Sequence, residues 1–235
     1  VAMGVKGTEA AKEAAEMVLT DDNFASIVAA VEEGRTVYDN IRKAILFILP
    51  TNGAQAMVVT IAVLLGQMLP MTPVQILWVN MVTAVTLALA LAFEPAEPGM
   101  MERPPRHADE PLLSGFLLWR IVLVSVLLVG MSYGMFRWLL EQGASLETAR
   151  TAAVNALVGG EIVYLFNSRY LRASCLNLRA LFGSKHVLIT VTLVSLLQLL
   201  FTYAGFMQTL FNTAPVDLAT WGEAALLALG AFLLV

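Results

Sequence analysis

Residues 4–55 decide the fold, and they read GVKGTEAAKEAAEMVLTDDNFASIVAAVEEGRTVYDNIRKAILFILPTNGAQ. The first half of this stretch is charged, the second half is apolar, and no strong helix stop separates them. From Asp22 onward apolar residues recur at helical spacing, at Phe24, Ile27, Val28, Val31, Tyr38 and Ile41. We therefore predict one long helix that leaves an aqueous domain and enters a lipid bilayer.

The composition of the whole chain also indicates an integral membrane protein. Hydrophobic residues make up 58% of the 235 residues and charged residues 14%, whereas roughly a quarter of an average soluble domain is charged. The formal net charge of −4 is mild and does not indicate a nucleic-acid partner. The single cysteine, Cys175, excludes an internal disulfide.

A bilayer-spanning helix needs about 20 apolar residues, and the sequence offers six such segments. We predict a mainly α fold, a polytopic membrane bundle of six transmembrane helices preceded by a small α/β remnant. The remnant is expected in residues 1–22, where Thr8 is a plausible helix cap, and a stalk helix in residues 23–43. The expected spans are about 44–65, 73–93, 115–139, 152–168, 187–210 and 218–235.

The positions of Lys and Arg predict the orientation, because basic residues gather in short cytosolic loops. Arg137 and Arg150 are the basic residues on one side of the predicted membrane. The other side has Arg35, Arg42, Lys43, Arg103, Arg106, Arg169, Arg172, Arg179 and Lys185. We therefore expect a cytosolic amino end and a cytosolic connector at residues 94–114, for which a rigid solvated linker is the simpler interpretation. Because the chain starts at Val1 and ends within an apolar run, we expect it to be part of a longer protein.

Polar residues inside the first two spans are candidates for ion binding. Pro50 and Gly53 should loosen the first helix near Asn52 and Gln55, freeing carbonyl oxygens that could face an ion. The second span places Asn80 and Thr83 on one face. Amide and hydroxyl oxygens suit hard cations, but hydrogen bonding between helices is an equally ordinary use of such residues.

Glu161 is the one carboxylate deep within an apolar run, VGGEIVYLFNS at residues 158–168. A charge at that depth costs at least about 2.5 kcal/mol, so Glu161 should face the bundle interior and bind a cation or a proton. A protonated, structural glutamic acid is the alternative. Gly159 and Gly160 should permit close helix approach, whereas Glu94 and Asp217 are expected at interfaces.

Residues 4–55, with PVQILWVNMVTAV at residues 73–85 and ERPPR at residues 102–106, closely resemble the P-type cation-transporting ATPases, nearest to the calcium-pump-like branch. The resemblance implies the end of a phosphorylation (HAD-like) domain in residues 1–22 and the family's fifth to tenth membrane helices in residues 44–235. It implies a bacterial plasma-membrane pump that hydrolyses ATP through an aspartyl phosphate.

The family's DKTGT and GDGxND motifs do not occur in this sequence. The resemblance therefore implies that ATP and magnesium bind in a missing N-terminal part of the same pump, and that this chain holds no catalytic residue. The expected partners are that N-terminal part, the transported cation and the bilayer.

The resemblance also implies a set of metal ligands, because calcium pumps use Asn and Glu from the fifth helix, Asn, Thr and Asp from the sixth, and Glu from the eighth. Gln55 replaces the fifth-helix Glu, and Ala84 replaces the sixth-helix Asp. The predicted ligands are Asn52, Gln55, Asn80, Thr83 and Glu161.

Two missing carboxylates weaken the calcium interpretation, since divalent affinity depends on ligand charge. The predicted function is an ATP-driven pump for calcium or another divalent cation. A monovalent-cation or proton pump is the alternative, and a passive channel, a carrier or a non-catalytic membrane subunit is the alternative of another class.

Overall fold

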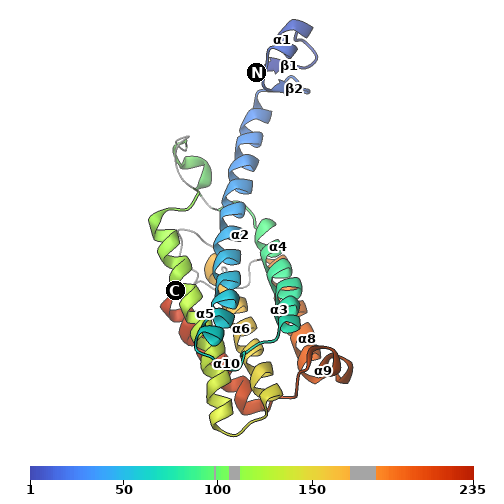
Figure 1. Cartoon of the computed structure of the whole chain (residues 1–235). Helices are drawn as coiled ribbons and strands as arrows, with labels where there is room; N and C mark the ends of the chain where they lie inside the picture. Colours follow the sequence, from blue (N-terminus) through green and yellow to red (C-terminus); the bar gives the residue numbers. More distant parts are fainter. Residues whose placement is uncertain (98, 106–111, 170–183) are drawn as a thin grey trace. The chain divides into compact units, whose positions relative to one another are not determined.

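The computed structural model describes residues 1–97, 99–105, 112–169 and 184–235, and these residues are mainly helical (Figure 1). Several residues used in the sequence analysis lie outside the described residues, namely Arg106, Arg172, Cys175 and Arg179. The chain forms two compact units, Val1–Asp39 with Pro95–Glu110, and Asn40–Glu94 with Pro111–Val235. Each unit is described by itself below.

The first unit contains a short parallel strand pair, β1 (Ala2–Met3) and β2 (Val18–Leu19), with helix α1 (Glu9–Glu13) between them in the chain. Thr8 caps α1 as predicted, since its hydroxyl accepts a hydrogen bond from the Ala11 N–H at 3.3 Å. Two paired residues in each strand make a minimal sheet, so the assignment of this segment to a phosphorylation domain stays a prediction.

The first unit also joins the start of helix α2 (Ala25–Leu64) to the segment around the 3₁₀ turn η2 (Met100–Glu102). Arg103 forms ion pairs with Asp39 at 2.8 Å and with Glu97 at 3.0 Å. Arg35 donates hydrogen bonds to two backbone carbonyls of the same segment. The predicted connector is thus held by charges and is not simply a solvated linker.

The second unit contains the rest of α2 and a series of further helices. These are α3 (Pro73–Val79), the π-helix η1 (Asn80–Ala84), α4 (Val85–Ala92), α5 (Gly115–Glu141), α6 (Leu146–Ser168), α8 (Lys185–Tyr203), α9 (Gly205–Phe211) and α10 (Leu218–Leu234). α2 runs through Pro50 without a break in its helical assignment.

Four helices of the described chain are long and apolar enough to cross a membrane: α2, the run Pro73–Ala92, α5 and α8. α6 and α10 overlap the other two predicted spans. Neither helix combines the length and the hydropathy of the four helices above, so their crossing of the membrane stays a prediction. The predicted span 187–210 covers two helices of the structure. α8 ends at Tyr203, and the extended backbone of Ala204 separates it from α9.

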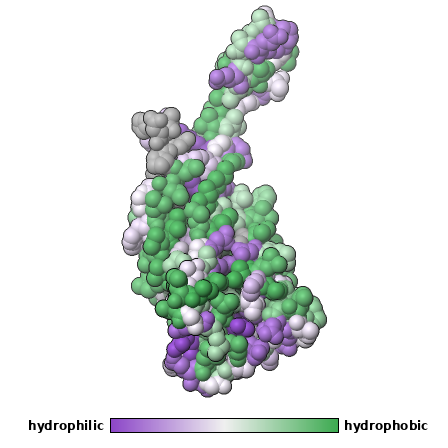
Figure 2. All heavy atoms as spheres, in the orientation of Figure 1, coloured by the Kyte–Doolittle hydropathy of each residue, from purple (hydrophilic) through white to green (hydrophobic). Residues whose placement is uncertain are grey.

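α6 lies at the centre of the second unit and packs against α5, α10, α3 and α8. Most of its residues are buried, and alanines at positions 149, 152, 153 and 156 let α5 and α10 come close. A helix surrounded by other helices in a membrane does not face lipid, and its small and polar residues can pack against its neighbours, which explains its lower hydropathy. Figure 2 shows that the visible surface of this bundle is largely apolar, while polar side chains gather where α5 turns into α6.

Candidate cation-binding site

Glu161 of α6 lies in the middle of the helical bundle with no exposed surface. The side chain of Gln55, from α2, is 2% exposed and donates a hydrogen bond from Nε2 to Glu161 Oε1 at 3.3 Å. These two residues are 106 positions apart in the chain. The fold therefore brings together a carboxylate and an amide that were both predicted to bind a cation.

Thr83 belongs to the π-helix η1, and its side chain is fully buried. The Thr83 hydroxyl donates to the carbonyl oxygen of Val79 at 2.5 Å. In the same turn the Val85 N–H reaches the carbonyl of Asn80, five residues earlier. π-Helical turns are rare and often occur at functional sites. The π-helix was not predicted from the sequence.

Two oxygen atoms of the pair, Gln55 Oε1 and Glu161 Oε2, are buried and have no hydrogen-bond partner among the described residues. A buried polar atom without a partner costs free energy, and such atoms are uncommon in native proteins. Amide and carboxylate oxygens are also the ligands that hard cations prefer. The chemistry of this pair therefore fits a small cation or a proton.

Asn52 and Asn80 are placed less decisively than the other predicted ligands. Asn52 is exposed, because the buried stripe of α2 passes through Thr51, Ala54 and Gln55 and leaves Asn52 outside it. Asn80 is half-buried in η1. The hydrogen bond described at the Glu161 carboxylate comes from Gln55, so the structure pairs these two residues and leaves Asn52, Asn80 and Thr83 as predicted ligands.

The prediction that Pro50 frees a carbonyl oxygen for an ion was wrong. Pro50 cannot donate to the carbonyl four residues earlier, which is that of Leu46. That oxygen instead accepts a hydrogen bond from the Tyr164 hydroxyl at 2.8 Å. The Tyr164 ring also stacks on Phe47, with ring centroids 6.0 Å apart. Tyr164 of α6, three residues after Glu161, thus supplies the hydrogen bond to the Leu46 carbonyl that Pro50 cannot make.

The two glycines before Glu161 differ in their role. A Cβ atom at Gly160 would lie 2.6 Å from Leu128 Cδ2 and 3.1 Å from Met131 Cε, both on α5. A Cβ at Gly159 would meet only the Cβ of Ala228, at 4.0 Å. The predicted close approach is confirmed at Gly160, where a Cβ atom would displace the side-chain ends of Leu128 and Met131.

A second buried polar cluster connects α3, α8 and α6, close to the π-helix η1. Trp78 donates from its indole nitrogen to Gln198 Oε1 at 3.3 Å, and Gln198 Nε2 donates to Asn155 Oδ1 at 2.7 Å. Because indole can only donate, it fixes the orientation of both amides. These residues were not predicted from the sequence, although Asn155 and Gln198 are amides within apolar runs, a pattern that indicates buried polar contacts.

Glu94 also differs from the expectation of an interfacial residue that needs no account. It is 5% exposed and forms a bidentate ion pair with Arg169, with distances of 3.0 and 3.2 Å. Asn40 donates to the Glu94 backbone carbonyl at 2.7 Å. This cluster connects α2, the end of α4 and the end of α6, and its charges are satisfied within the protein.

The described residues contain no group of three or more His, Cys, Asp or Glu side chains that could hold a metal ion. Any cation bound near Glu161 would therefore depend on one carboxylate supplemented by neutral oxygens. That donor set is typical of a transport site inside a membrane, where charged groups are expensive and functional.

Comparison with known proteins decides the family. Residues 68–235 match the family described as cation transporting ATPase, C-terminus. The chain belongs to this family of cation-transporting ATPases. With its apolar helices, this membership makes the chain part of an integral membrane protein, and it confirms the resemblance to P-type cation pumps.

Several relatives of this cation-transporting ATPase chain have names that specify more. The probable cation-transporting ATPase F of Mycobacterium tuberculosis is 50% identical over 94% of this chain and 24% of the relative. The cation-transporting ATPase pma1 of Synechocystis is 44% identical over 94% of this chain and 25% of the relative. The calcium-transporting ATPase 1 of Bacillus cereus is 36% identical over 97% and 27%. The chain thus spans about a quarter of the length of these relatives.

Proposed function

We propose that this chain forms the ion-translocating part of an ATP-driven cation pump in the bacterial plasma membrane, with its amino end in the cytosol. The observation that carries the proposal is the buried Gln55–Glu161 pair, which holds two oxygens without partners inside a bundle of this family. The bacterial relatives named as cation and calcium transporters support it.

In this proposal Glu161 supplies the negative charge that attracts the cation. Gln55 orients the carboxylate through its Nε2–H group and offers its own Oε1 as a ligand. Thr83 adds a hydroxyl oxygen from a helix whose regular hydrogen bonding is already interrupted. Asn80 and Asn52 complete the set of ligands, with Asn52 facing outward, where a helix outside this chain could cover it.

The energy for transport would come from the remainder of the parent protein. ATP, magnesium and an aspartyl phosphate intermediate belong to that remainder, whose motifs this sequence does not carry. α2 links the two functions in the proposal, because the same helix begins in the charged amino-terminal segment and carries Gln55. A movement of its first turns would thus change the surroundings of Gln55.

The preferred ion is calcium or another divalent cation, as the name of the Bacillus cereus relative suggests. One observation favours a monovalent cation or a proton. The site has one carboxylate, with Gln55 and Ala84 at the positions where the resemblance implies acids, and divalent affinity rises with the number of charged ligands.

ATPase activity of the full-length parent tests the proposal. The purified protein is assayed with calcium, manganese, sodium and potassium, each at several pH values and at constant magnesium. We expect selective stimulation of ATPase activity by one ion. Stimulation by calcium or manganese would show that the pump transports a divalent cation. A membrane protein that conducts ions without hydrolysing ATP would overturn the proposal in favour of a channel or a carrier.

A further inference from the structure

Arg120 of α5 is a buried cation without a carboxylate partner. It is 8% exposed and donates from Nη2 to the backbone carbonyl of Asn167 at 2.7 Å. Its guanidinium carbon lies 5.8 Å from the centre of the Tyr164 ring. Its Nε–H group is buried without a hydrogen-bond partner, and no ion pair forms at Arg120 among the described residues.

These contacts satisfy only part of what a buried guanidinium requires. A carbonyl at a helix end and an aromatic face both attract a cation, but neither carries a full negative charge. Burying a charge is expensive unless it is paired and hydrogen-bonded. Arg120 therefore has unused capacity to bind an anion, and a guanidinium suits phosphate best because of its planar donor edge.

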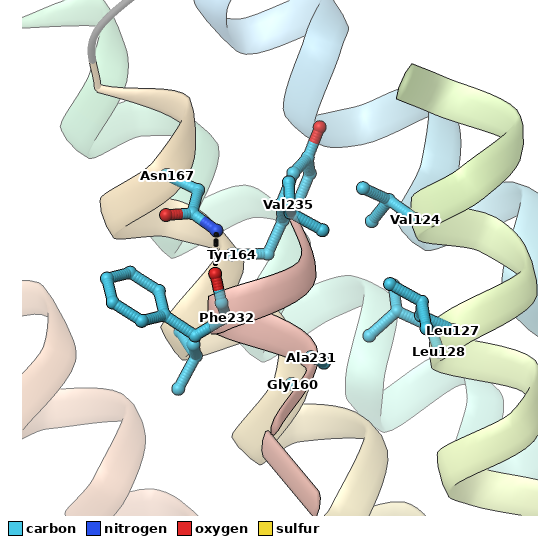
Figure 3. A pocket seen from close by; sticks show the side chains of 10 residues that line it. Val124, Leu127, Leu128, Gly160, Tyr164, Asn167, Ala231, Phe232 and Val235 are labelled. Atoms are coloured by element: carbon cyan, nitrogen blue, oxygen red, sulfur yellow. Dashed lines mark hydrogen bonds between the residues drawn. The ribbon is translucent and has the colours of Figure 1, made fainter. Parts of the chain in front are cut away.

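A shallow apolar crevice, partly open to the surroundings, lies close to Arg120, which is not itself one of its lining residues. Tyr164 and Asn167, which contact Arg120, both line it, and so does Val124, one turn along α5. Figure 3 shows Val124 and Leu128 of α5 directed toward α10, whose residues Phe232 and Val235 border the other side. The crevice thus has an apolar body formed by α5, α6 and α10.

The depth of Arg120 in the membrane agrees with a headgroup position. Arg120 is the sixth residue of α5, about 9 Å from its start at 1.5 Å per residue. Phe116 and Trp119 are exposed next to it, and their rings lie 6.1 Å apart. Exposed aromatic residues are typical of the boundary between headgroups and acyl chains.

We propose that this place binds an anionic phospholipid, with its phosphate on Arg120 and one acyl chain in the crevice between α5, α6 and α10. The charge selects the anionic headgroup, and the apolar walls select a chain. This site is separate from Glu161 and its ligands, so the inference does not depend on the proposed transport function.

Lipid binding to the full-length parent tests the inference without any assay of ATP hydrolysis. Native mass spectrometry measures retention of phosphatidylglycerol and of phosphatidylcholine with identical acyl chains. For the wild type we expect phosphatidylglycerol to bind about tenfold more tightly, because Arg120 repels the positively charged choline of phosphatidylcholine. Equal retention of the two lipids would overturn the inference.

Three variants locate the site. Arg120→Gln removes the charge, and Ala231→Phe fills the crevice while leaving Arg120 in place. Arg137→Gln, at the other end of α5, is the matched control, since Arg137 is exposed and paired with Glu141 at 3.3 Å. We expect the preference for phosphatidylglycerol to disappear in the first two variants and to persist in the control.

Other outcomes contradict the inference. Persistence of the preference in Arg120→Gln or in Ala231→Phe would show that the lipid binds elsewhere. Displacement of phosphatidylglycerol by glycerol phosphate at equal concentration would show a site for soluble phosphate. If Arg120→Gln fails to fold, Ala231→Phe decides alone, and Arg120→Lys should then retain the preference.

Discussion

The packing at Gly160 allows a prediction in which two neighbouring positions give different results. An alanine methyl at Gly160 would approach Leu128 Cδ2 to 2.6 Å and Met131 Cε to 3.1 Å, whereas at Gly159 it meets Ala228 Cβ at 4.0 Å. Leu128 and Met131 are themselves buried, and the ends of both side chains would have to shift to make room for the methyl group. Overpacking of this kind typically costs about 1–3 kcal/mol.

Both substitutions gain the same helix propensity, about 0.5–1 kcal/mol for Gly→Ala, and that gain cancels in their comparison. We therefore expect Gly160→Ala to be less stable than Gly159→Ala by about 1–3 kcal/mol. The assay is thermal unfolding of the two purified full-length variants in the same detergent, beside the wild type. If Gly160→Ala melts at or above the temperature of Gly159→Ala, the described contact between α5 and α6 is refuted.

Two further predictions concern polar groups. Gln198→Leu leaves the Trp78 indole N–H without its acceptor and leaves Asn155 Oδ1 with the Thr202 hydroxyl alone, so stability should fall by about 1–3 kcal/mol; an unchanged melting temperature would contradict this. At the start of α10, hydrogen bonds from the hydroxyl and backbone N–H of Thr220 lower the pKa of Asp217 below its ordinary value. Asp217 therefore stabilises the fold above its unfolded-state pKa, and this contribution is lost as pH falls through the lowered folded-state pKa. Asp217→Asn should reduce the fall in melting temperature on acidification, and an identical acid profile would contradict that.

Helical periodicity and span length gave the positions of most helices, because both are local properties of the chain. The long helix predicted from Asp22 onward, which is α2 (Ala25–Leu64), and the apolar runs near α5 and α8 are examples. The break at Ala204 was missed, since no Pro or charged residue marks it. The π-helix at Asn80–Ala84 was also missed, because it depends on how the Thr83 hydroxyl competes with backbone hydrogen bonds.

The candidate site could be predicted only in part. Glu161 stood out because a lone carboxylate in an apolar run is costly. Its meeting with Gln55, 106 positions away, is a tertiary contact that no local pattern contains, and the family resemblance alone suggested it. The Leu46 carbonyl shows the reverse case, since local reasoning correctly saw it freed by Pro50 but could not see Tyr164 satisfying it.

Buried charges were the weakest part of the sequence reasoning. Glu94 lies at the end of an apolar run and looked interfacial, but Arg169 reaches it from another helix. Arg120 also lies inside a predicted span, at residues 115–139, but its burial was not predicted from the sequence. In both cases the cost of burial was known, and the partner was set by packing between distant segments.

The most direct test of the central claim is the activation constant of the full-length parent for its stimulating ion, compared between Glu161→Gln and Glu147→Gln. Both residues belong to α6, and Glu147 lies in its first turn, away from the site. Loss of one charge-assisted interaction of about 1.5–3 kcal/mol corresponds to roughly a tenfold to hundredfold change. We expect the activation constant to rise by at least about tenfold in Glu161→Gln and to stay unchanged in Glu147→Gln. Equal activation constants in the wild type and both variants would contradict the assignment of Glu161 as a cation ligand.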